Sequence, residues 1–340
     1  MSMGIRDDLI IFTTDITMQT EIQHQLPNGK NRSIWAIAIT VIIALILSYV
    51  IIYQISEYGV ALFILLPIFM GMGSSVIKGY KASITTKEAR RVAFQSLLYY
   101  GLVLFVFAME GLICIVMAAP FALLLVWLGS YLGYLIINHK QQQSINAVVG
   151  LIALIPLFAF AERTITPPVK PVTSSVIIDA PIEVVWDNVI AFPRLEEPSD
   201  LIFKAGISYP ISSKIEGNGV GAVRYCQFNT GDFVEPITTW EENKLLAFDV
   251  EEQPVPMREL SFWDVDSPHL HDYFVSKRGQ FELNQLEDGK VELIGTTWYY
   301  HDIKPDAYWR LWSNYIIHKI HHRVLEHIKV VSESQSPDLQ

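Results

Sequence analysis

Cysteine and positive charge are both scarce in this 340-residue sequence. There are two cysteines, Cys114 in an apolar stretch and Cys226 in a later polar stretch, and we expect them to lie in separate compartments. No disulfide framework is therefore predicted. Lysine and arginine number 25 against 35 aspartate and glutamate residues, which gives a net charge of −10. Because phosphate binding needs clustered basic side chains, the sequence predicts no nucleic-acid partner.

Short motifs for cofactors and metals are also missing. The sequence has no nucleophile elbow, P-loop, dinucleotide-binding glycine pattern or zinc signature, so we predict no cofactor and no metal. His318 and His322 share a helical face, but no third ligand is spaced nearby. A second polar cluster surrounds Pro268, and loop composition explains it without a catalytic role: His269, His271, Asp264, Asp266 and Asp272.

Charged residues nearly vanish between residues 33 and 160, outside two short loops. The first run of roughly 21 uncharged residues would span about 31 Å as a helix, enough to cross the hydrocarbon core of a bilayer. It is too long for the core of a signal peptide, so we expect a retained helix. We predict an α-helical transmembrane bundle over 33–161, with a cytoplasmic segment over 1–32 before it. Its five or so spans are 33–53, 58–77, 92–112, 117–137 and 145–161.

Basic residues set the expected orientation, because loops rich in lysine and arginine stay in the cytoplasm. They crowd the loop between the second and third spans: Lys78, Lys81, Lys87, Arg90 and Arg91. Five spans then deliver the following domain to the outer side of a bacterial-type inner or plasma membrane. The last run, 145–161, is the shortest, and if it lies in the interface instead, the domain is cytoplasmic.

Glu110 is the one acidic residue inside the apolar half that lies away from the short loops. Intramembrane carboxylates are costly, which makes Glu110 a candidate functional residue. The alternative is a hairpin turn between Glu110 and Pro120, which would leave the carboxylate at the membrane interface. Small residues on the second span suit close helix packing: Gly71, Gly73, Ser74 and Ser75.

A stiff tether over 162–172 follows the bundle. Three prolines deny it a helix: Pro167, Pro168 and Pro171. We expect a polar domain over 173–333 and a tail over 334–340.

The order of elements in this domain predicts its fold. A strand over 174–179 precedes a helix that starts at Pro181, and several strands separated by turn residues follow. A long amphipathic helix begins at Asp306. This order is typical of an α+β fold in which the last helix packs in a curved antiparallel sheet and leaves a ligand cavity.

Three segments of the domain carry a family likeness. They are SSVIIDAPIEVVW over 174–186, EGNGVGAVRYCQFNTGDFVE over 216–235 and TTWYYHDIKPDAYWRLW over 296–312. Together they resemble the START-like (SRPBCC) superfamily, which includes polyketide cyclases, Bet v 1 allergens and lipid-transfer domains. The motifs are structural rather than catalytic. The resemblance covers 173–333 and implies a helix-grip domain that binds a lipid or other hydrophobic small molecule. It covers none of the apolar half, so the expectation that this domain follows a bacterial-type multi-pass membrane bundle rests on the hydrophobic runs alone.

Alternate strand positions face the concave side of such a sheet, but the sequence does not fix which set does. Trp298 and Tyr300 share one face, and Tyr299 and His301 share the other. Aromatic pairs serve a protein core as well as a ligand wall. The candidate cavity residues are Arg224, Glu235, Trp298, Tyr300, His301, Trp312 and Tyr315, and Glu259 is a further charged candidate.

Two other functions stand beside non-catalytic lipid binding. In an enzyme of the cyclase or hydrolase type, His301, Arg224 or Glu235 would polarise a carbonyl or move a proton in the same cavity. In a transporter or sensor, the bundle would be the working part and the domain a regulatory cap, with Glu110 as its support. We favour the binding domain, because the motifs that the sequence carries specify a fold and not an activity.

Overall fold

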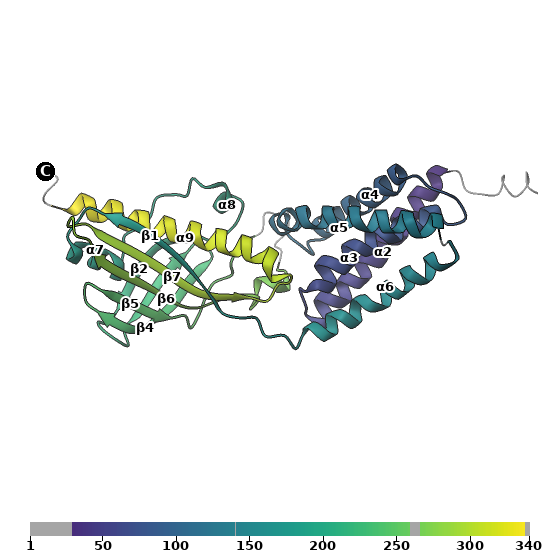
Figure 1. The fold of residues 1–340 in the computed structure, drawn as a ribbon. Coiled ribbons are helices and arrows are strands. Elements are labelled where there is room, and N and C mark those ends of the chain that lie inside the picture. Colours follow the sequence, from purple (N-terminus) through teal and green to yellow (C-terminus); the bar gives the residue numbers. More distant parts are fainter. Residues whose placement is uncertain (1–28, 140, 259–265, 337–340) are drawn as a thin grey trace, which may run out of the picture.

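The computed structural model describes residues 29–139, 141–258 and 266–336. Two parts lie end to end, a bundle of helices and a curled sheet wrapped around one long helix (Figure 1). Two residues considered above, Glu259 and Asp264, lie outside the described residues.

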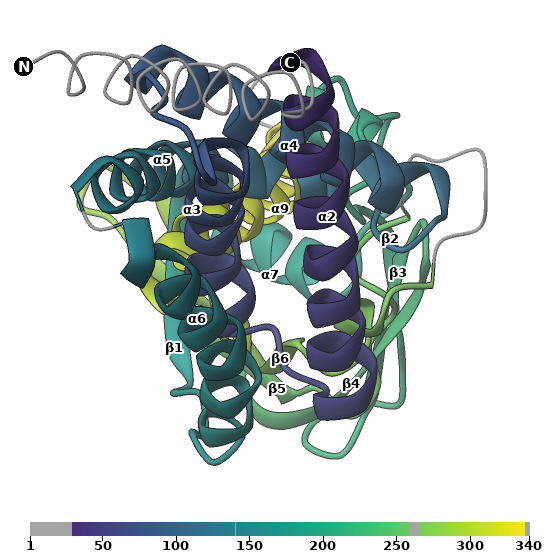
Figure 2. The same cartoon turned by 90° about the vertical axis from the view of Figure 1, so that its right-hand side faces the viewer.

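The bundle has long helices that alternate in direction. They are α2 (Gly29–Tyr49), α3 (Leu66–Gly79), α4 (Thr86–Val106), α5 (Leu112–His139) and α6 (Gln141–Glu162), with the π-helical turns η1 (Val50–Ile55) and η2 (Ala61–Leu65) between α2 and α3. α3 contacts each of the other four helices, as the view along the bundle shows (Figure 2). The turns at 56–60 and 107–111 and the end of α6 face the sheet domain, whereas the turn at 80–85, the end of α5 and the start of α6 lie at the far end (Figure 1).

The outer surface of the bundle is apolar, with large exposed side chains such as Ile46, Leu98 and Leu157. Within the described residues, four helices are long and apolar enough to cross a membrane: Asn31–Ile55, Ala61–Gly79, Leu112–His139 and Gln143–Glu162. α4 is not among them, and its first two turns carry charged residues: Lys87, Glu88, Arg90 and Arg91. The structure thus has four candidate spans where the sequence predicts about five.

The helix at the predicted third span is displaced from 92–112 toward the N-terminus. A capping box starts it early, because Thr85 Oγ1 accepts from the Glu88 N–H at 3.2 Å and the Glu88 carboxylate accepts from the Thr85 N–H at 2.9 Å. The chain turns at 107–111, earlier than expected, and the proline that we expected to bound the turn lies within α5. Glu110 therefore lies in a turn at the sheet-facing end of the bundle and not in the middle of a span.

Seven antiparallel strands form one sheet in the order β1-β7-β6-β5-β4-β3-β2. They are β1 (Lys170–Ile178), β2 (Pro210–Glu216), β3 (Val223–Phe228), β4 (Gly231–Glu241), β5 (Leu245–Asp249), β6 (Phe274–Gln285) and β7 (Val291–His301). The sheet curls around α9 (Asp306–Gln335), while α7 (Ile182–Ile190) covers one end and α8 (Leu201–Lys204) lies in a long connection (Figure 1). The predicted curved antiparallel sheet around a C-terminal helix is confirmed.

β1 begins at Lys170, inside the predicted tether over 162–172 and before the expected domain start at residue 173. Pro171 is tolerated there because β1 is an edge strand, paired with β7 alone. The connection between the two parts is therefore shortened to residues 163–169.

α3 and α5 approach so closely that their crossing requires glycine. A Cβ atom at Gly71 would lie 2.3 Å from the carbonyl oxygen of Val126, and one at Gly129 would lie 2.3 Å from the carbonyl oxygen of Ile68. Both neighbours are backbone atoms, which cannot turn aside as a side chain can. The packing role expected for Gly71 is confirmed.

Gly71→Ala should lower the thermal unfolding midpoint of the detergent-solubilised protein, because the added methyl group forces the two helices apart. Overpacking of this kind costs about 1–3 kcal/mol. Gly150→Ala is the matched control, since a Cβ atom at Gly150 in α6 meets nothing within 4 Å. Equal midpoints for the two variants would contradict the assigned close approach.

Candidate functional site

One cavity of about 640 Å³ is lined by both parts of the protein. In the sheet domain its walls come from β3 to β7 and from α9, and in the bundle they come from α3, α4 and α5. Along α9 the lining extends from Trp309 to Leu325, which is about 24 Å at helical rise. The volume suits a small molecule, and the length suits an extended one.

The cavity opens sideways between α4 and α5. Leu98 on α4 and Leu123 on α5 line it at this end, and both are also exposed on the outside of the bundle, Leu98 to 69%. Gly101 on α4 also lines the cavity here, and a Cβ atom at this position would meet only a methyl group of Ile115, at 3.8 Å. A molecule in the cavity can therefore contact the surroundings of the bundle.

An ion pair lies in the part of the cavity inside the sheet. Arg224 on β3 and Glu235 on β4 pair across neighbouring strands and are 2% and 6% exposed. Burial raises the pKa of the Glu235 carboxyl, and the guanidinium beside it opposes that rise. The rings of Phe248 and Phe281 lie 5.3 and 5.4 Å from the guanidinium carbon. Nε of Arg224 is buried without a hydrogen-bond partner in the described part of the chain.

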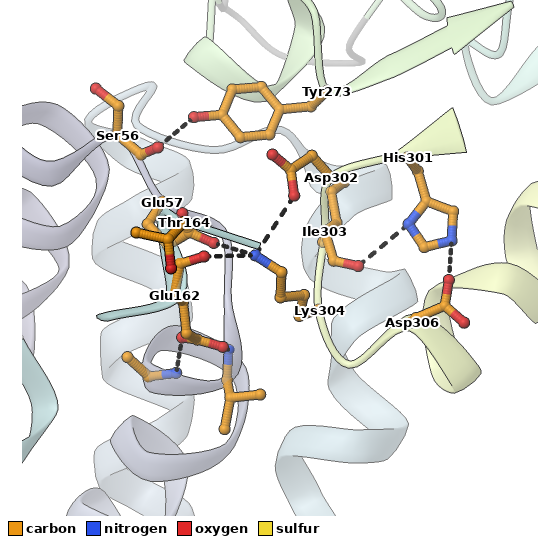
Figure 3. Close-up of polar contacts among 12 residues, drawn as sticks. Ser56, Glu57, Glu162, Thr164, Tyr273, His301, Asp302, Ile303, Lys304 and Asp306 are labelled. Carbon is orange, nitrogen blue, oxygen red and sulfur yellow. Dashed lines mark hydrogen bonds and ion pairs between the residues drawn. The ribbon is translucent and has the colours of Figure 1, made fainter. Parts of the chain in front are cut away.

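His301, the last residue of β7, lines the cavity but turns its nitrogens toward protein groups. Nδ1 donates to the carbonyl oxygen of Ile303 at 3.1 Å, and Nε2 lies 3.6 Å from the carboxylate of Asp306 (Figure 3). Burial lowers the pKa of His301, and the charge of Asp306 opposes that change. The ring thus ties the end of the sheet to the start of α9.

Four of the seven predicted cavity residues line the cavity: Arg224, Glu235, His301 and Trp312. Three are not among its lining residues, Trp298, Tyr300 and Tyr315. Trp298 lies against the guanidinium of Arg278 at 4.0 Å and Tyr300 against the ammonium of Lys277 at 5.3 Å, on the opposite face of β7 from His301. Tyr315 lies on the exposed side of α9.

Polar contacts join the two parts beside the cavity (Figure 3). Lys304 Nζ pairs with Glu57 Oε1 at 2.8 Å, and the Lys304 N–H donates to the carbonyl oxygen of Tyr58 at 2.8 Å. Burial raises the pKa of Glu57, and the ammonium of Lys304 opposes that rise. Glu162, at the end of α6, accepts from the Val60 N–H at 2.9 Å and so caps η2. The start of α9, the end of α6 and the turn before η2 are thereby fixed together.

Aromatic packing closes the same junction. The ring of Trp309 lies 4.8 Å from that of Phe63 in an edge contact, and the ring of Tyr308 stacks on Phe121 at 4.9 Å. The Tyr308 hydroxyl donates to the carbonyl oxygen of Met117 in α5. The first turn of α9 therefore seals the sheet domain onto the bundle.

Sequence reasoning missed a cluster at this junction. Cys114 Sγ lies 3.1 Å from Nε2 of His269, and Nδ1 of the same ring lies 3.4 Å from Glu110 Oε2. The Tyr58 hydroxyl donates to Glu110 Oε1 at 3.2 Å, and all four side chains line the cavity. Cys114 and His269 are 155 positions apart, so no spacing motif links them. The one sign of this cluster in the sequence was that Cys114 follows Glu110 by four positions.

Among the described residues, this cluster is also the one group of three His, Cys, Asp or Glu side chains whose ligand atoms lie within 4.8 Å of one another. The histidines of α9 do not gather in this way. His318 Nδ1 bonds to Ser174 Oγ at 2.8 Å, and His322 is exposed. In the other predicted polar cluster, His271 bonds to Asp266 at 2.5 Å on the surface.

Arg224→Met should destabilise the sheet domain by about 3–5 kcal/mol, because it leaves the Glu235 carboxylate buried without its partner. Thermal unfolding followed by tryptophan fluorescence measures the change. The double variant Arg224→Met/Glu235→Met should recover most of the loss, since no buried charge then remains.

Lys214→Met is the matched control for Arg224→Met. Lys214 lies on the adjacent strand β2 and pairs with Glu216 at 3.8 Å in solvent. Exposed pairs contribute little to stability, so the unfolding midpoint should not change. A double variant less stable than Arg224→Met alone would contradict the assigned role of the buried pair.

No family model matches the chain, and no curated protein matches it. Solved structures match its C-terminal half. The Zhui aromatase/cyclase from Streptomyces sp. R1128 is 12% identical over 49% of this chain and 96% of its own, with a TM-score of 0.32. Norcoclaurine synthase from Thalictrum flavum is 10% identical over 49% and 94%, with a TM-score of 0.31. A protein from Nitrosospira multiformis is 19% identical over 49% and 98%, with a TM-score of 0.30. At these values the likeness concerns the fold of the C-terminal half alone.

Proposed function

We propose that this chain is a membrane-anchored helix-grip protein that binds a lipid, or another hydrophobic molecule with a long chain, at the membrane surface. The observation that supports this is the course of the cavity, from the interior of the curled sheet to the opening between α4 and α5. The opening is rimmed by side chains on the outer surface of the bundle, where a bilayer would supply the surroundings.

A chain that moved from a bilayer through this opening would pass from one apolar environment to another. Lipid tails are as apolar as leucine side chains, so the move costs little hydrophobic free energy. A water-soluble molecule would have to leave water to follow the same route. The guanidinium of Arg224, which lines the cavity inside the sheet, would meet an oxygen atom of the ligand there.

At the predicted residues, binding is favoured over the cyclase or hydrolase alternative, because the side chains that would act in catalysis are already bonded to other groups of the protein. Arg224 is paired with Glu235, and His301 is bonded to Ile303. The transporter or sensor alternative rested on Glu110 as a carboxylate within the membrane. Glu110 lies instead in a turn at the end of the bundle, so this support is lost.

We further propose that the bundle crosses an inner or plasma membrane with the sheet domain on the outer side. The support is the alternation of the helices, which puts the basic turns, with Lys81 and Lys87, at the end away from the sheet. In cells whose cytoplasmic membrane is intact, added protease should therefore remove a C-terminal tag. A tag that is cut only after this membrane is permeabilised would contradict the orientation.

Protein purified in mild detergent from its own membrane should carry a chain-bearing molecule, roughly one per protein for a pocket of this kind. Native mass spectrometry, followed by extraction and identification of the bound molecule, measures this. The binding proposal fails if the cavity repeatedly contains only detergent or water.

Gly101→Phe should slow the uptake of a fluorescent long-chain fatty acid several-fold, because the new ring fills the gap between α4 and α5. Gly150→Phe is the control, since that position on α6 faces open space and lies away from the cavity. Stopped-flow fluorescence with both variants in the same detergent gives the rates. Equal rates would argue against the side opening as the route.

A further inference from the structure

The side chains of Cys114, His269 and Glu110 gather closely around one imidazole, with one ligand atom from each within 4.8 Å of the others. Cys114 Sγ lies 3.1 Å from Nε2 of the ring, and Glu110 Oε2 lies 3.4 Å from Nδ1. A neutral ring with its proton on Nδ1 carries its lone pair on Nε2, next to the Cys114 thiol, while the Glu110 carboxylate lies near the protonated nitrogen. This is the order nucleophile, base and orienting carboxylate that activates a cysteine for attack on a carbonyl.

Burial strengthens this assignment. The His269 side chain is 7% exposed and that of Glu110 is 12% exposed. Nδ1 of His269 is buried without a hydrogen-bond partner among the described residues, and the group nearest to it is the Glu110 carboxylate. Burial lowers the pKa of His269 to about 4, helped by the charge of His271, so the ring is neutral at neutral pH. A fourth group, Tyr58, fixes the other carboxylate oxygen.

Cys114 also lies in the first turn of α5, which starts at Leu112. The amide groups of a first turn have no acceptor within the helix, and the helix dipole is positive there. Both features stabilise a thiolate and the oxyanion that forms when it attacks a carbonyl group. The cluster faces the cavity, so a molecule bound there can reach the thiol.

A metal ion is the competing explanation of the arrangement. The thiol, the carboxylate and one ring nitrogen lie within 4.8 Å of one another, so the three side chains could share one ion. The thiol and the carboxylate are nearest to different nitrogens of the ring, however, and one imidazole supplies a single nitrogen to an ion. Zinc binding is therefore an outcome for experiment to exclude.

We propose that Cys114 and His269 are catalytic residues and Glu110 is a positioning residue for acyl transfer from a long-chain ester bound in the cavity. This inference rests on the proposed binding of a chain-bearing molecule. In the proposed orientation Cys114 lies at the sheet-facing end of α5, where the hydrocarbon core gives way to the polar region of a bilayer. Ester groups of membrane lipids lie at that depth, which identifies the substrate class.

The reaction sequence balances with water as the one further reactant. His269 Nε2 takes the proton of the Cys114 thiol, and the thiolate attacks the ester carbonyl carbon to form a carbon–sulfur bond. The carbon–oxygen bond breaks, and the alcohol leaves with the proton from His269. Water, deprotonated by the same nitrogen, then attacks the acyl-thioester, which releases a carboxylic acid and restores the thiol.

The full chain in detergent, mixed with p-nitrophenyl acetate and with p-nitrophenyl palmitate, tests this. We expect a burst of p-nitrophenol and an acyl group on Cys114 by peptide mass spectrometry. Cys226 is the internal control, because burial raises the pKa of its thiol to about 12, and it should stay unmodified. Cys114→Ser should remove the burst, and His269→Gln should slow acylation about 100-fold.

His322→Gln is the matched histidine control, since His322 is exposed on α9, and its burst should equal that of the unaltered protein. Thermal unfolding of each variant shows whether the fold is kept. Acylation of Cys226 in place of Cys114, or a burst that disappears with a chelator and returns with zinc, would overturn the proposal.

The variant Glu110→Gln tests whether the Glu110 carboxylate acts on His269 or only supports the fold. Without the carboxylate charge the imidazolium that pairs with the thiolate is less stable, so the pH profile of Cys114 alkylation by iodoacetamide should move to higher pH. The other titratable groups that act on this cluster are Tyr53, Tyr58, Tyr100 and His271. An unchanged profile would remove Glu110 from the assignment.

The two esters also distinguish failure of this inference from failure of the proposed function. Acylation by the acetate but not by the palmitate would uphold the reactive cluster and count against binding of a long chain. No acylation by either ester, in protein that still carries its bound lipid, would uphold binding and overturn the chemistry.

Discussion

The first turn of α9 packs against the bundle, and the cavity exists in its observed form because of that contact. Trp309 and Tyr308 insert their rings beside η2 and α5, and Lys304 places its ammonium on Glu57. Without this seal the open end of the curled sheet would expose its apolar interior to water. With it, the interior continues into the space beside α4 and α5, so neither part of the chain has a complete pocket alone.

Two buried ion pairs bring charge into this apolar interior and the junction beside it. Glu235 neutralises Arg224 inside the sheet, and Glu57 neutralises Lys304 at the junction. An unpaired charge in either place would cost several kcal/mol, so the pairs fix strand register and the seating of α9 more than they add stability. The His269 ring differs from these groups, because it is neutral and lies between a thiol and a carboxylate.

Patterns within short segments predicted most of the architecture. Turn residues and alternation located the sheet, and the apolar stripe located α9, because these patterns depend on neighbours in sequence. Which face of β7 lines the cavity could not be predicted. Alternation places Trp298 and His301 on opposite faces of the strand, but it does not say which of the two faces α9 covers. The meeting of Cys114 with His269 was also beyond reach, because it depends on how two separately folded parts pack. Charge at the start of α4 hid the true limits of that helix.

The short connection over 163–169 limits how a bound molecule could be passed to an acceptor. Extended, these residues reach at most about 25 Å, and the junction around Lys304 holds the domain closer still. If the bundle spans a membrane as proposed, a domain restrained in this way cannot diffuse from one membrane to another as a free carrier does. Any molecule that the cavity takes up would then be collected and released at one place, so its acceptor would have to travel to the protein.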